Sequence, residues 1–328
     1  MLAPVPDHPA AGDASRALWQ GDTPSVIEVT EMAERVRASV RAAVELSEPT
    51  LEVIMATLLA GGHLLIEDHP GVGKTMLARA LAASLGGRLT RIQATIDLLP
   101  ADIVGANVWR AEEGRFHFQP GPVFANVVLV DEINRATPKT QSGLLESMEE
   151  RQVTVDGETR PISPPFMVIA TQNPSAGHDG TYALPLASSD RFLARVSLGY
   201  PSRAAEMRLL SDEPRRAATV ATRDALLGAQ ATVAAVHTSE RLLHYVVDLL
   251  TFTRQHERIA VGASPRAGVK LLSAARGRAA LFGRDHVLPD DVKVLAPAVL
   301  AHRLQPVWED DEATHAVVDE ALREVPAT

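Results

Sequence analysis

The sequence predicts an α/β protein with a parallel central sheet and helices on both faces, followed by a smaller all-helical domain. Two observations support this prediction. Between residues 63 and 198, short apolar runs typical of buried strands alternate with stretches of helical periodicity, as in parallel sheets covered on both faces. After residue 201, helical stretches follow one another and no strand of any strength is predicted between them.

The chain has 328 residues, which is enough for two packed domains. Hydrophobic residues make up 46% and aromatic residues only 4%, so the core should consist mainly of Leu, Val and Ala. Residues 1–24 are rich in Ala, Pro, Gly and Asp and are predicted to form a flexible tail. The α/β domain is then expected at residues 25–201 and the helical domain at residues 202–328.

Charge and cysteine content argue against several classes of protein. The formal net charge of −9 disfavours binding of nucleic acid through a broad basic surface. The chain has no cysteine, which excludes disulfides and thiolate metal sites and fits a reducing cytoplasm. We expect no membrane span and no signal peptide, because no apolar run approaches about 20 residues and the N-terminus lacks a charged start.

The first elements lead into a phosphate-binding loop. Helices are expected at 25–45 and 49–59, and a buried strand at 63–67, followed by a Gly-rich turn and a helix over 74–85. In such a loop the glycines let backbone N–H groups surround phosphates, and the helix N-terminus faces them. The residues expected to bind the nucleotide are Pro70, Gly71, Val72, Gly73, Lys74, Thr75 and Met76.

Within this loop, Lys74 is expected to reach the β- and γ-phosphates of ATP, and the Thr75 hydroxyl to hold Mg²⁺. The strict pattern has Gly at position 68, where this chain has Asp68. We expect this exchange to be tolerated, because the position lies on the approach to the loop and not under the phosphates.

Two acids follow an apolar strand predicted at 127–130. A central strand would place Asp131 beside the phosphate-binding loop, where it could order Mg²⁺, and Glu132 where it could polarise the attacking water. Two acids at a strand end are, on their own, more often solvated surface groups. The loop upstream favours the catalytic interpretation.

The remaining elements follow in order. A further strand is expected at 88–95, a helix at 138–150, and a hairpin at 152–162 around the Asp156-Gly157 pair. Strands at 166–171 and 195–198 complete the sheet. The helices expected after the sheet are 203–211, 223–236, 240–256, 265–282, 290–305 and 312–324.

Several runs of residues, in one order along the chain, resemble the MoxR family of AAA+ ATPases. They extend the similarity over residues 25 to about 310. The resemblance implies an ATPase that uses ATP and Mg²⁺. The matching runs are Leu64–Ala80, Arg91–Gln93, Asp97–Gly105, Phe118–Phe124, Asp131–Ala136, Lys139–Gln141, Ala170–Pro174, Asp190–Phe192 and Gly262–Arg266.

The resemblance implies catalytic roles for three more residues. Asn173 corresponds to sensor 1, which orients the attacking water, and its alternative role is that of a turn residue before a proline. Arg191 corresponds to the arginine finger, which acts on ATP held by a neighbouring subunit; the alternative is a surface ion pair with Asp190. Arg266 corresponds to sensor 2, and the alternative is a solvated side chain.

The residues before Arg266 predict its place in a helix. Ser264 is expected to cap that helix and Pro265 to occupy its first position, so that Arg266 lies in the first turn, which could face the phosphates. Near Arg191 the chain departs from the family pattern at Leu186, Ser188 and Ser189.

The resemblance also implies a chaperone-like motor that forms a homo-oligomeric ring, expected to be a hexamer, and remodels or matures a protein client. The usual partner carries a von Willebrand factor A domain, and metal or cofactor insertion is among the family's tasks. Segments 118–124 and 152–162 would face the ring surface or the pore. The alternatives are a magnesium-chelatase-like motor subunit and a nucleotide-gated scaffold with little hydrolysis.

Overall fold

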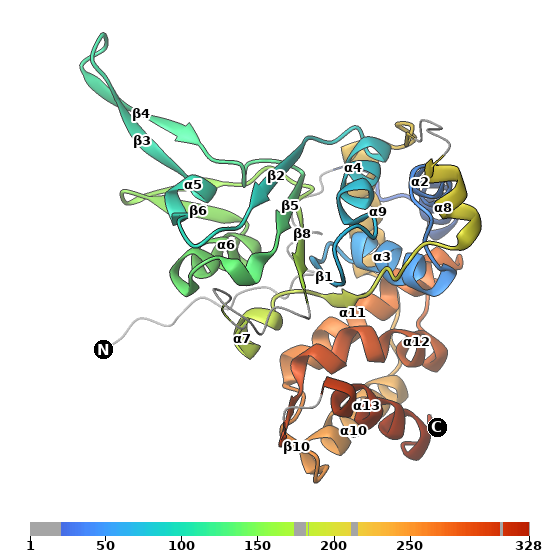
Figure 1. Cartoon of the computed structure of the whole chain (residues 1–328). Coiled ribbons are helices and arrows are strands. Elements are labelled where there is room, and N and C mark those ends of the chain that lie inside the picture. The colour runs from blue at the N-terminus through green and yellow to red at the C-terminus, as the bar shows by residue number, and fades with distance from the viewer. Residues whose placement is uncertain (1–20, 174–181, 183, 211–215, 309–310, 328) are drawn as a thin grey trace, which may run out of the picture.

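A five-stranded parallel sheet forms the centre of the protein (Figure 1). The structure is a computed structural model that describes residues 21–173, 182, 184–210, 216–308 and 311–327. The strand order β2-β5-β8-β1-β9 and the parallel pairing of all neighbours confirm the predicted fold class. The strands are β1 (Leu64–Glu67), β2 (Leu89–Gln93), β5 (Val127–Asp131), β8 (Met167–Gln172) and β9 (Ala194–Val196).

Side chains of the sheet alternate between two hydrophobic clusters, one on each face. In β5, Val127 and Leu129 join the larger cluster, while Val128 and Val130 join the smaller one. The larger cluster packs against α2 (Val26–Ala43), α3 (Glu48–Leu59) and α4 (Lys74–Ser84), and the smaller one against α5 (Pro100–Val104) and α6 (Pro138–Glu150). Burial on both faces explains why the strands read as continuous apolar runs.

The helices after the sheet lie close to their predicted ranges. A short helix, α7 (Leu186–Ser189), which the sequence did not predict, precedes β9, and 3₁₀ turns follow β5 at Ile133–Arg135 and α12 at Ala301–Arg303. The helices of the C-terminal part are α8 (Arg203–Leu210), α9 (Arg223–Ala234), α10 (Glu240–Gln255), α11 (Pro265–Leu281), α12 (Pro289–Leu300) and α13 (Asp311–Glu324).

A small antiparallel pair in the C-terminal part was not predicted. It joins β10 (Ile259–Val261) to β11 (Gln305–Pro306). Strands of three and two residues are too short to show a periodicity of two, and the proline at the end of the second one disfavours a strand prediction. The C-terminal part is otherwise helical, as expected.

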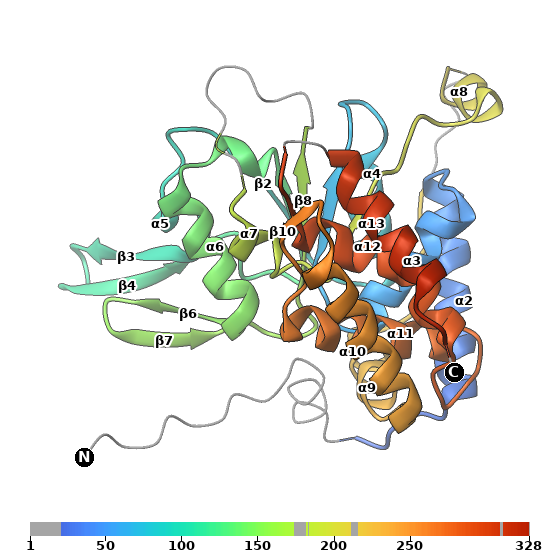
Figure 2. The ribbon, with the colours of Figure 1, turned by 90° about the horizontal axis from the view of Figure 1, so that it is seen from below.

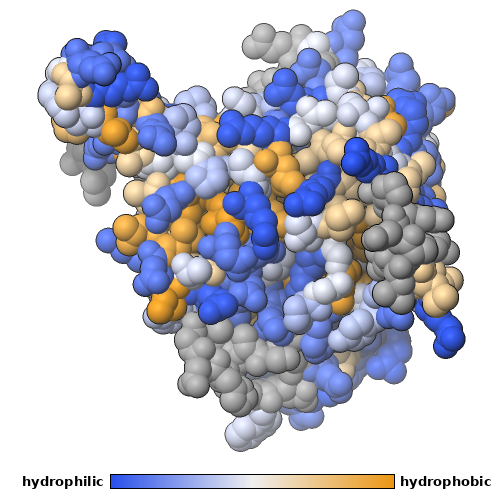
Figure 3. Space-filling model, turned by 45° about the horizontal axis from the view of Figure 1, so that its top comes forward, coloured by the Kyte–Doolittle hydropathy of each residue, from blue (hydrophilic) through white to orange (hydrophobic). Residues whose placement is uncertain are grey.

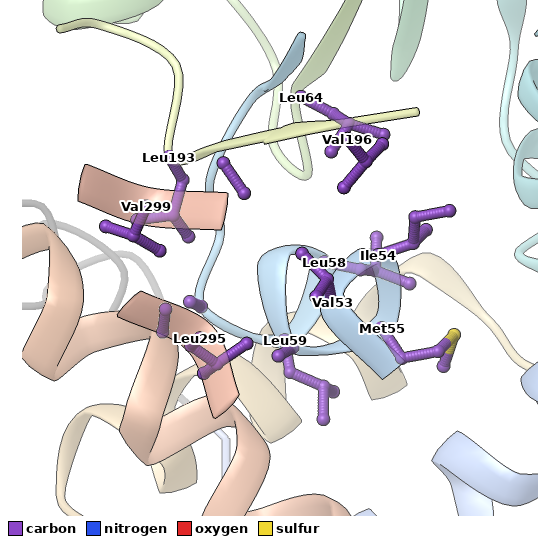
Figure 4. Packing of buried hydrophobic residues seen from close by; sticks show 14 of the residues in the cluster. Val53, Ile54, Met55, Leu58, Leu59, Leu64, Leu193, Val196, Leu295 and Val299 are labelled. Atoms are coloured by element: carbon purple, nitrogen blue, oxygen red, sulfur yellow. The ribbon is translucent and has the colours of Figure 1, made fainter. Parts of the chain in front are cut away.

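One hydrophobic cluster joins the sheet to the C-terminal helices through α3 (Figure 4). Ile54 and Leu58 of α3 lie between the sheet residues Leu64 and Val196 and the helices beyond, and Leu295 of α12 packs into the same cluster. The change from α/β to helical structure occurs near residue 200, but the core is continuous across it. The division into domains at residue 201 therefore stays a prediction.

Two hairpins project from the body of the molecule on the side of α5 and α6 (Figures 1 and 2). One is β3 (Gly105–Arg110) with β4 (Arg115–Pro120), and the other, β6 (Gln152–Val155) with β7 (Glu158–Pro161), is the predicted Asp-Gly hairpin. They are linked by Nδ2 of Asn107, which donates to the Asp156 carboxylate at 2.7 Å. The space-filling view shows the β3–β4 hairpin standing clear of the surface (Figure 3).

His63, just before β1, connects three elements in the interior. Its Nδ1 accepts a hydrogen bond from the Val168 N–H at 3.0 Å, so Nε2 carries the proton and donates to the Met148 carbonyl at 3.1 Å. Burial, with a smaller contribution from the Arg151 guanidinium, lowers the pKa of His63 from 6.5 to about 3. The folded protein therefore keeps this imidazole neutral well below neutral pH.

This lowered pKa predicts a stability that falls with pH. Between pH 6.5 and pH 3 the unfolded chain binds a proton at His63, whereas the folded chain does not. The free energy of unfolding therefore decreases as the pH falls through this window. On changing the pH from 7.5 to 5.5 the loss due to His63 should be about 1.4 kcal/mol. Urea unfolding of the wild type and of His63→Gln at both pH values measures it. His302 is also buried and has a lowered pKa, but it is present in both proteins, so its contribution cancels when their pH-dependent losses are compared. Equal pH-dependent losses in the two chains would contradict the assignment.

Candidate nucleotide-binding site

A cleft lies at the carboxyl ends of four neighbouring strands, β1, β2, β5 and β8. Parallel pairing places these ends at one edge of the sheet, where ligands of α/β proteins bind. The cleft gathers the loop after β1 and polar side chains from the other three strands. Its lining residues are Pro70, Gly71, Gly73, Lys74, Thr75, Met76, Arg91, Gln93, Asp131, Glu132, Thr171 and Asn173.

The loop after β1 is shaped by two glycines in the left-handed region. Gly71 has φ +90° and Gly73 has φ +99°, and side chains other than glycine rarely adopt these angles. Gly73 is also the N-cap of α4 and provides no side-chain acceptor, whereas six other described helices begin with a Ser or Thr side chain that accepts from the backbone. The first N–H groups of α4 are thus left for an anion in the cleft.

Lys74 opens α4 and lies among acidic side chains. Its Nζ donates to the backbone carbonyl of Asp68. Burial lowers the pKa of Lys74, and the neighbouring carboxylates, Asp68 and Asp131 first, act in the opposite direction. An ammonium group held at this place can exchange its carbonyl partner for a phosphate oxygen. Val72 alone of the seven predicted loop residues does not line the cleft; its side chain is buried in the larger hydrophobic cluster.

Asp131 ends β5 and lines the cleft together with the loop. Its Oδ2 accepts from Nε of Arg91 at 2.6 Å, and its Oδ1 lies 3.5 Å from the Thr171 hydroxyl. The Thr75 hydroxyl lines the same cleft. This donor set consists of oxygens only, which suits Mg²⁺.

Glu132 adopts an unusual backbone conformation, with φ +56°. A residue other than glycine in this region costs on the order of 1–3 kcal/mol, and such strain tends to collect at functional sites. The conformation is held by Thr171, whose hydroxyl accepts from the Glu132 N–H at 2.9 Å. The carboxylate accepts from Arg135 at 3.0 Å and lies 3.4 Å from Nε2 of Gln93.

Three residues of the cleft were not assigned a role from the sequence. Arg91 and Gln93 project from β2 two residues apart, and the register pairs Gln93 with Asp131. Thr171 lies on β8 between the two strands that carry the loop and the acids. The sequence feature that could have identified these three residues is their position, since they are polar residues at the ends of strands that share one edge of the sheet. Asn173, which was predicted, lines the cleft two residues beyond Thr171.

The two predicted catalytic arginines lie outside the cleft and share one carboxylate. Nε of Arg191 is 3.1 Å from Oε2 of Glu149, and Nη1 of Arg266 is 3.1 Å from Oε1 of the same residue. Ser264 caps α11 through the Ala267 N–H at 3.2 Å, which confirms the predicted helix start. The first turn of α11 thus faces Glu149, the last glutamate but one of α6.

Arg191 does not form the ion pair with Asp190 that was the alternative to a catalytic role. The Asp190 carboxylate accepts instead from Nε of the buried Arg303 at 2.7 Å. The departures from the family pattern, Leu186 and Ser188–Ser189, form α7, and the Ala187 carbonyl accepts from Nη1 of Arg191 at 3.0 Å.

Asp68 has a structural role that the sequence did not predict. Its Oδ2 accepts from the Ser197 hydroxyl at 2.9 Å and from the N–H groups of Leu198 and Gly199 at 2.7 and 2.8 Å. Burial raises the pKa of this carboxyl, but these hydrogen bonds and one from the His69 N–H outweigh it, so the pKa of Asp68 lies below its usual value. Asp68 therefore ties the phosphate-binding loop to the segment that leads into the C-terminal helices.

In the part of the chain that the structure describes, no helix is both long and apolar enough to cross a bilayer. Nor does this part of the chain group three or more His, Asp or Glu side chains in a way that could hold a metal by themselves.

Comparisons with known proteins agree with this geometry. Residues 63–194 match the family model of the ATPases associated with various cellular activities (AAA), and residues 251–324 match the AAA lid domain. The chain is 39% identical over 307 residues to Chaperone MoxR1 of Mycobacterium tuberculosis, covering 89% of this chain and 81% of that protein. It is 46% identical over 255 residues to the uncharacterized protein YeaC of Bacillus subtilis, covering 76% and 79%.

A crystal structure shows the same fold. A proposed ATPase from Cytophaga hutchinsonii superimposes with a TM-score of 0.83 at 33% identity, over 92% of this chain and 96% of that one. Both parts of the chain are thus found together in a solved relative.

Asp68→Ala should destabilise the folded protein, because it leaves the N–H groups of Leu198 and Gly199 without their acceptor. An unsatisfied buried donor costs about 1–3 kcal/mol, so the free energy of unfolding should fall by about 3 kcal/mol. Ser197→Ala is the matched control, since it removes one donor and leaves the two backbone hydrogen bonds, and it should cost about 1 kcal/mol. Urea unfolding measures both. Equal stabilities of Asp68→Ala and the wild type would contradict the anchoring role.

Proposed function

The chain belongs to the MoxR family of AAA+ ATPases, and on that premise we propose that it binds and hydrolyses ATP in the cleft at the start of α4. One observation carries the proposal. Lys74 and Thr75, which follow β1, line the same cleft as Asp131 and Glu132, which end β5. A cationic loop at a helix N-terminus and two acids are the parts that phosphoryl transfer to water requires.

Six side chains of the cleft take a part in this reaction. The N–H groups at the start of α4 and Lys74 bind the phosphates. Thr75 and Asp131 would hold Mg²⁺, which when bound offsets negative charge on the phosphate oxygens. Glu132 polarises the attacking water and Asn173 orients it, while Thr171 fixes the backbone of Glu132.

Binding of the nucleotide has to rearrange two ion pairs. Arg91 contacts the Asp131 carboxylate at 2.6 Å, and Arg135 contacts Glu132 at 3.0 Å. Both carboxylates are needed for the metal and the water, so these guanidinium groups must move. Because both arginines are half-exposed, they can turn toward solvent or toward the phosphates at little cost.

We place Arg191 and Arg266 at the seam with a neighbouring subunit. Neither lines the cleft of its own chain, and both are held by Glu149 on another element. An arginine that reaches the phosphates from a neighbour supplies transition-state charge only in an assembly. The proposal is therefore a homo-oligomeric ring, most simply a hexamer, whose active sites are completed between subunits.

The ring would act on a protein client. The β3–β4 hairpin carries the exposed aromatic rings of Trp109 and Phe116, 5.2 Å apart, and aromatic side chains are favoured at protein contacts. We propose that this hairpin grips the client in the cytoplasm. The proposal includes a von Willebrand factor A domain protein as partner and metal or cofactor insertion as a task. A nucleotide-gated scaffold that hydrolyses little ATP fits less well, because Glu132 and Asn173 both line the cleft.

Glu132→Gln tests the hydrolysis step. The amide keeps the shape of the side chain but cannot take up a proton, so ATP affinity should stay near that of the wild type. Turnover should fall by about 10²- to 10⁴-fold. Binding is measured by calorimetry and turnover by phosphate release, with Glu31→Gln on the exposed surface of α2 as the control. Normal turnover of Glu132→Gln would remove Glu132 as the group that activates water.

A further inference from the structure

Glu149 joins the two arginines that the proposed function places at the seam. They come from distant parts of the chain, since Arg191 lies two residues after α7 and Arg266 in the first turn of α11, while Glu149 lies in the last turn of a third element, α6. Each arginine takes one oxygen of the carboxylate, at 3.1 Å in both cases. Two guanidinium groups so close would repel one another without the anion between them.

The main chain beside Arg191 is fixed from a different direction. Arg303, which is buried after α12, donates to the Asp190 carboxylate at 2.7 Å and to the Asp190 carbonyl at 3.1 Å. The C-terminal helices thus anchor the backbone next to Arg191, and α6 orients its side chain. Lys270, one turn after Arg266 on α11, adds a partly buried cation.

This cluster carries a surplus of positive charge. Four cations, Arg191, Arg266, Lys270 and Arg303, lie with two carboxylates, Glu149 and Asp190. Burial first, and then the neighbouring arginines, lower the pKa of Lys270 to about 8, while Asp190 and Glu149 act in the opposite direction. Arg303 is buried and paired with Asp190. Arg191, Arg266 and Lys270 therefore stand against the single carboxylate of Glu149, and this surplus suits an anion such as the triphosphate of another subunit.

The contacts with Glu149 orient the arginines without using up their donors. Among the described residues, Arg191 uses Nε and Nη1, and Arg266 uses Nη1. Within the described part of the chain no hydrogen bond or ion pair uses Nη2 of either side chain, so both groups can donate to phosphate oxygens. Glu149 can therefore position the two arginines without blocking their contact with a phosphate.

We propose that Glu149 is a positioning residue that holds Arg191 and Arg266 together in the arrangement in which both reach the triphosphate bound by the adjacent subunit. The inference rests on the proposed function. Both side chains lose rotamer entropy when they are held in place. With Glu149 this ordering is complete before the neighbour's nucleotide arrives, which is how preorganised charge accelerates a reaction.

A mixing experiment with full-length chains tests the inference. The Lys74→Ala chain cannot use its own cleft but still presents Arg191 and Arg266 to a neighbour. The Arg191→Ala chain keeps its cleft but lacks the arginine that would act on the neighbour's ATP. Each alone should be nearly inactive, and their mixture should regain ATP turnover. Absence of this rescue would overturn action between subunits, and with it the seam part of the proposed function.

Glu149→Gln is then added to one chain at a time. In the Lys74→Ala donor it should lower the rescued kcat by about ten- to a hundredfold, because a neutral amide cannot hold both guanidinium groups. The KM for ATP, set by the other chain's cleft, should stay within about twofold. In the Arg191→Ala chain the same change should leave the rescue intact. Glu146→Gln, an exposed glutamate one turn earlier in α6, is the control in the donor.

Assembly is measured in the same mixtures, because a donor that does not join the ring would imitate a lost rescue. The donor carries a tag, and the rescued rate is divided by the amount of Arg191→Ala chain that co-purifies with it. A lower rate per co-assembled chain supports the positioning role. An unchanged or higher rate, or a loss that only follows reduced co-assembly, overturns it while leaving the rescue between Lys74→Ala and Arg191→Ala, and hence the proposed function, intact.

Discussion

The parallel pairing of β1 and β5 with β8 is the constraint on which the site depends. Because all three strands run in one direction, their carboxyl ends meet at one edge of the sheet. The phosphate-binding loop continues from β1, and Asp131 and Glu132 end β5. Thr171 of β8 lies between them and contacts both acids. The middle strand thus separates a cation on one side from two carboxylates on the other, and its Thr171 holds the acidic side in place.

The positively charged side chains considered for nucleotide contact lie in two places. Lys74 and Arg91 lie in the cleft, whereas Arg191 and Arg266 are gathered on Glu149. The hydrophobic cluster around α3 holds the sheet and the C-terminal helices as one packed body, so the distance between the two places is set by the core. Asp68 adds a polar connection from the loop to the segment entering those helices. We propose that a ring brings the two places together across each seam.

Local signals in the sequence were enough to predict the sheet, most helices and the loop with its two acids. Lys74, Thr75, Asp131 and Glu132 could be found because they follow apolar strands directly. Arg91, Gln93 and Thr171 could not be assigned, because a polar residue in a strand becomes a site residue only through its neighbours in the sheet. The contact between Arg266 and Glu149 depends on how α11 packs against the rest of the core, which no local pattern encodes. The β10–β11 pair is too short to leave a pattern at all.

The claim that the loop and the acids together bind a triphosphate with Mg²⁺ is tested most directly by calorimetric titration of ATP, with and without Mg²⁺, into the wild type and Lys74→Ala. Lys139→Ala, an exposed lysine on α6, is the matched control. We expect the wild type and the control to bind ATP more tightly with Mg²⁺, and Lys74→Ala to lose at least about 100-fold in affinity, or about 2.7 kcal/mol. An affinity of Lys74→Ala equal to that of the wild type would contradict the account.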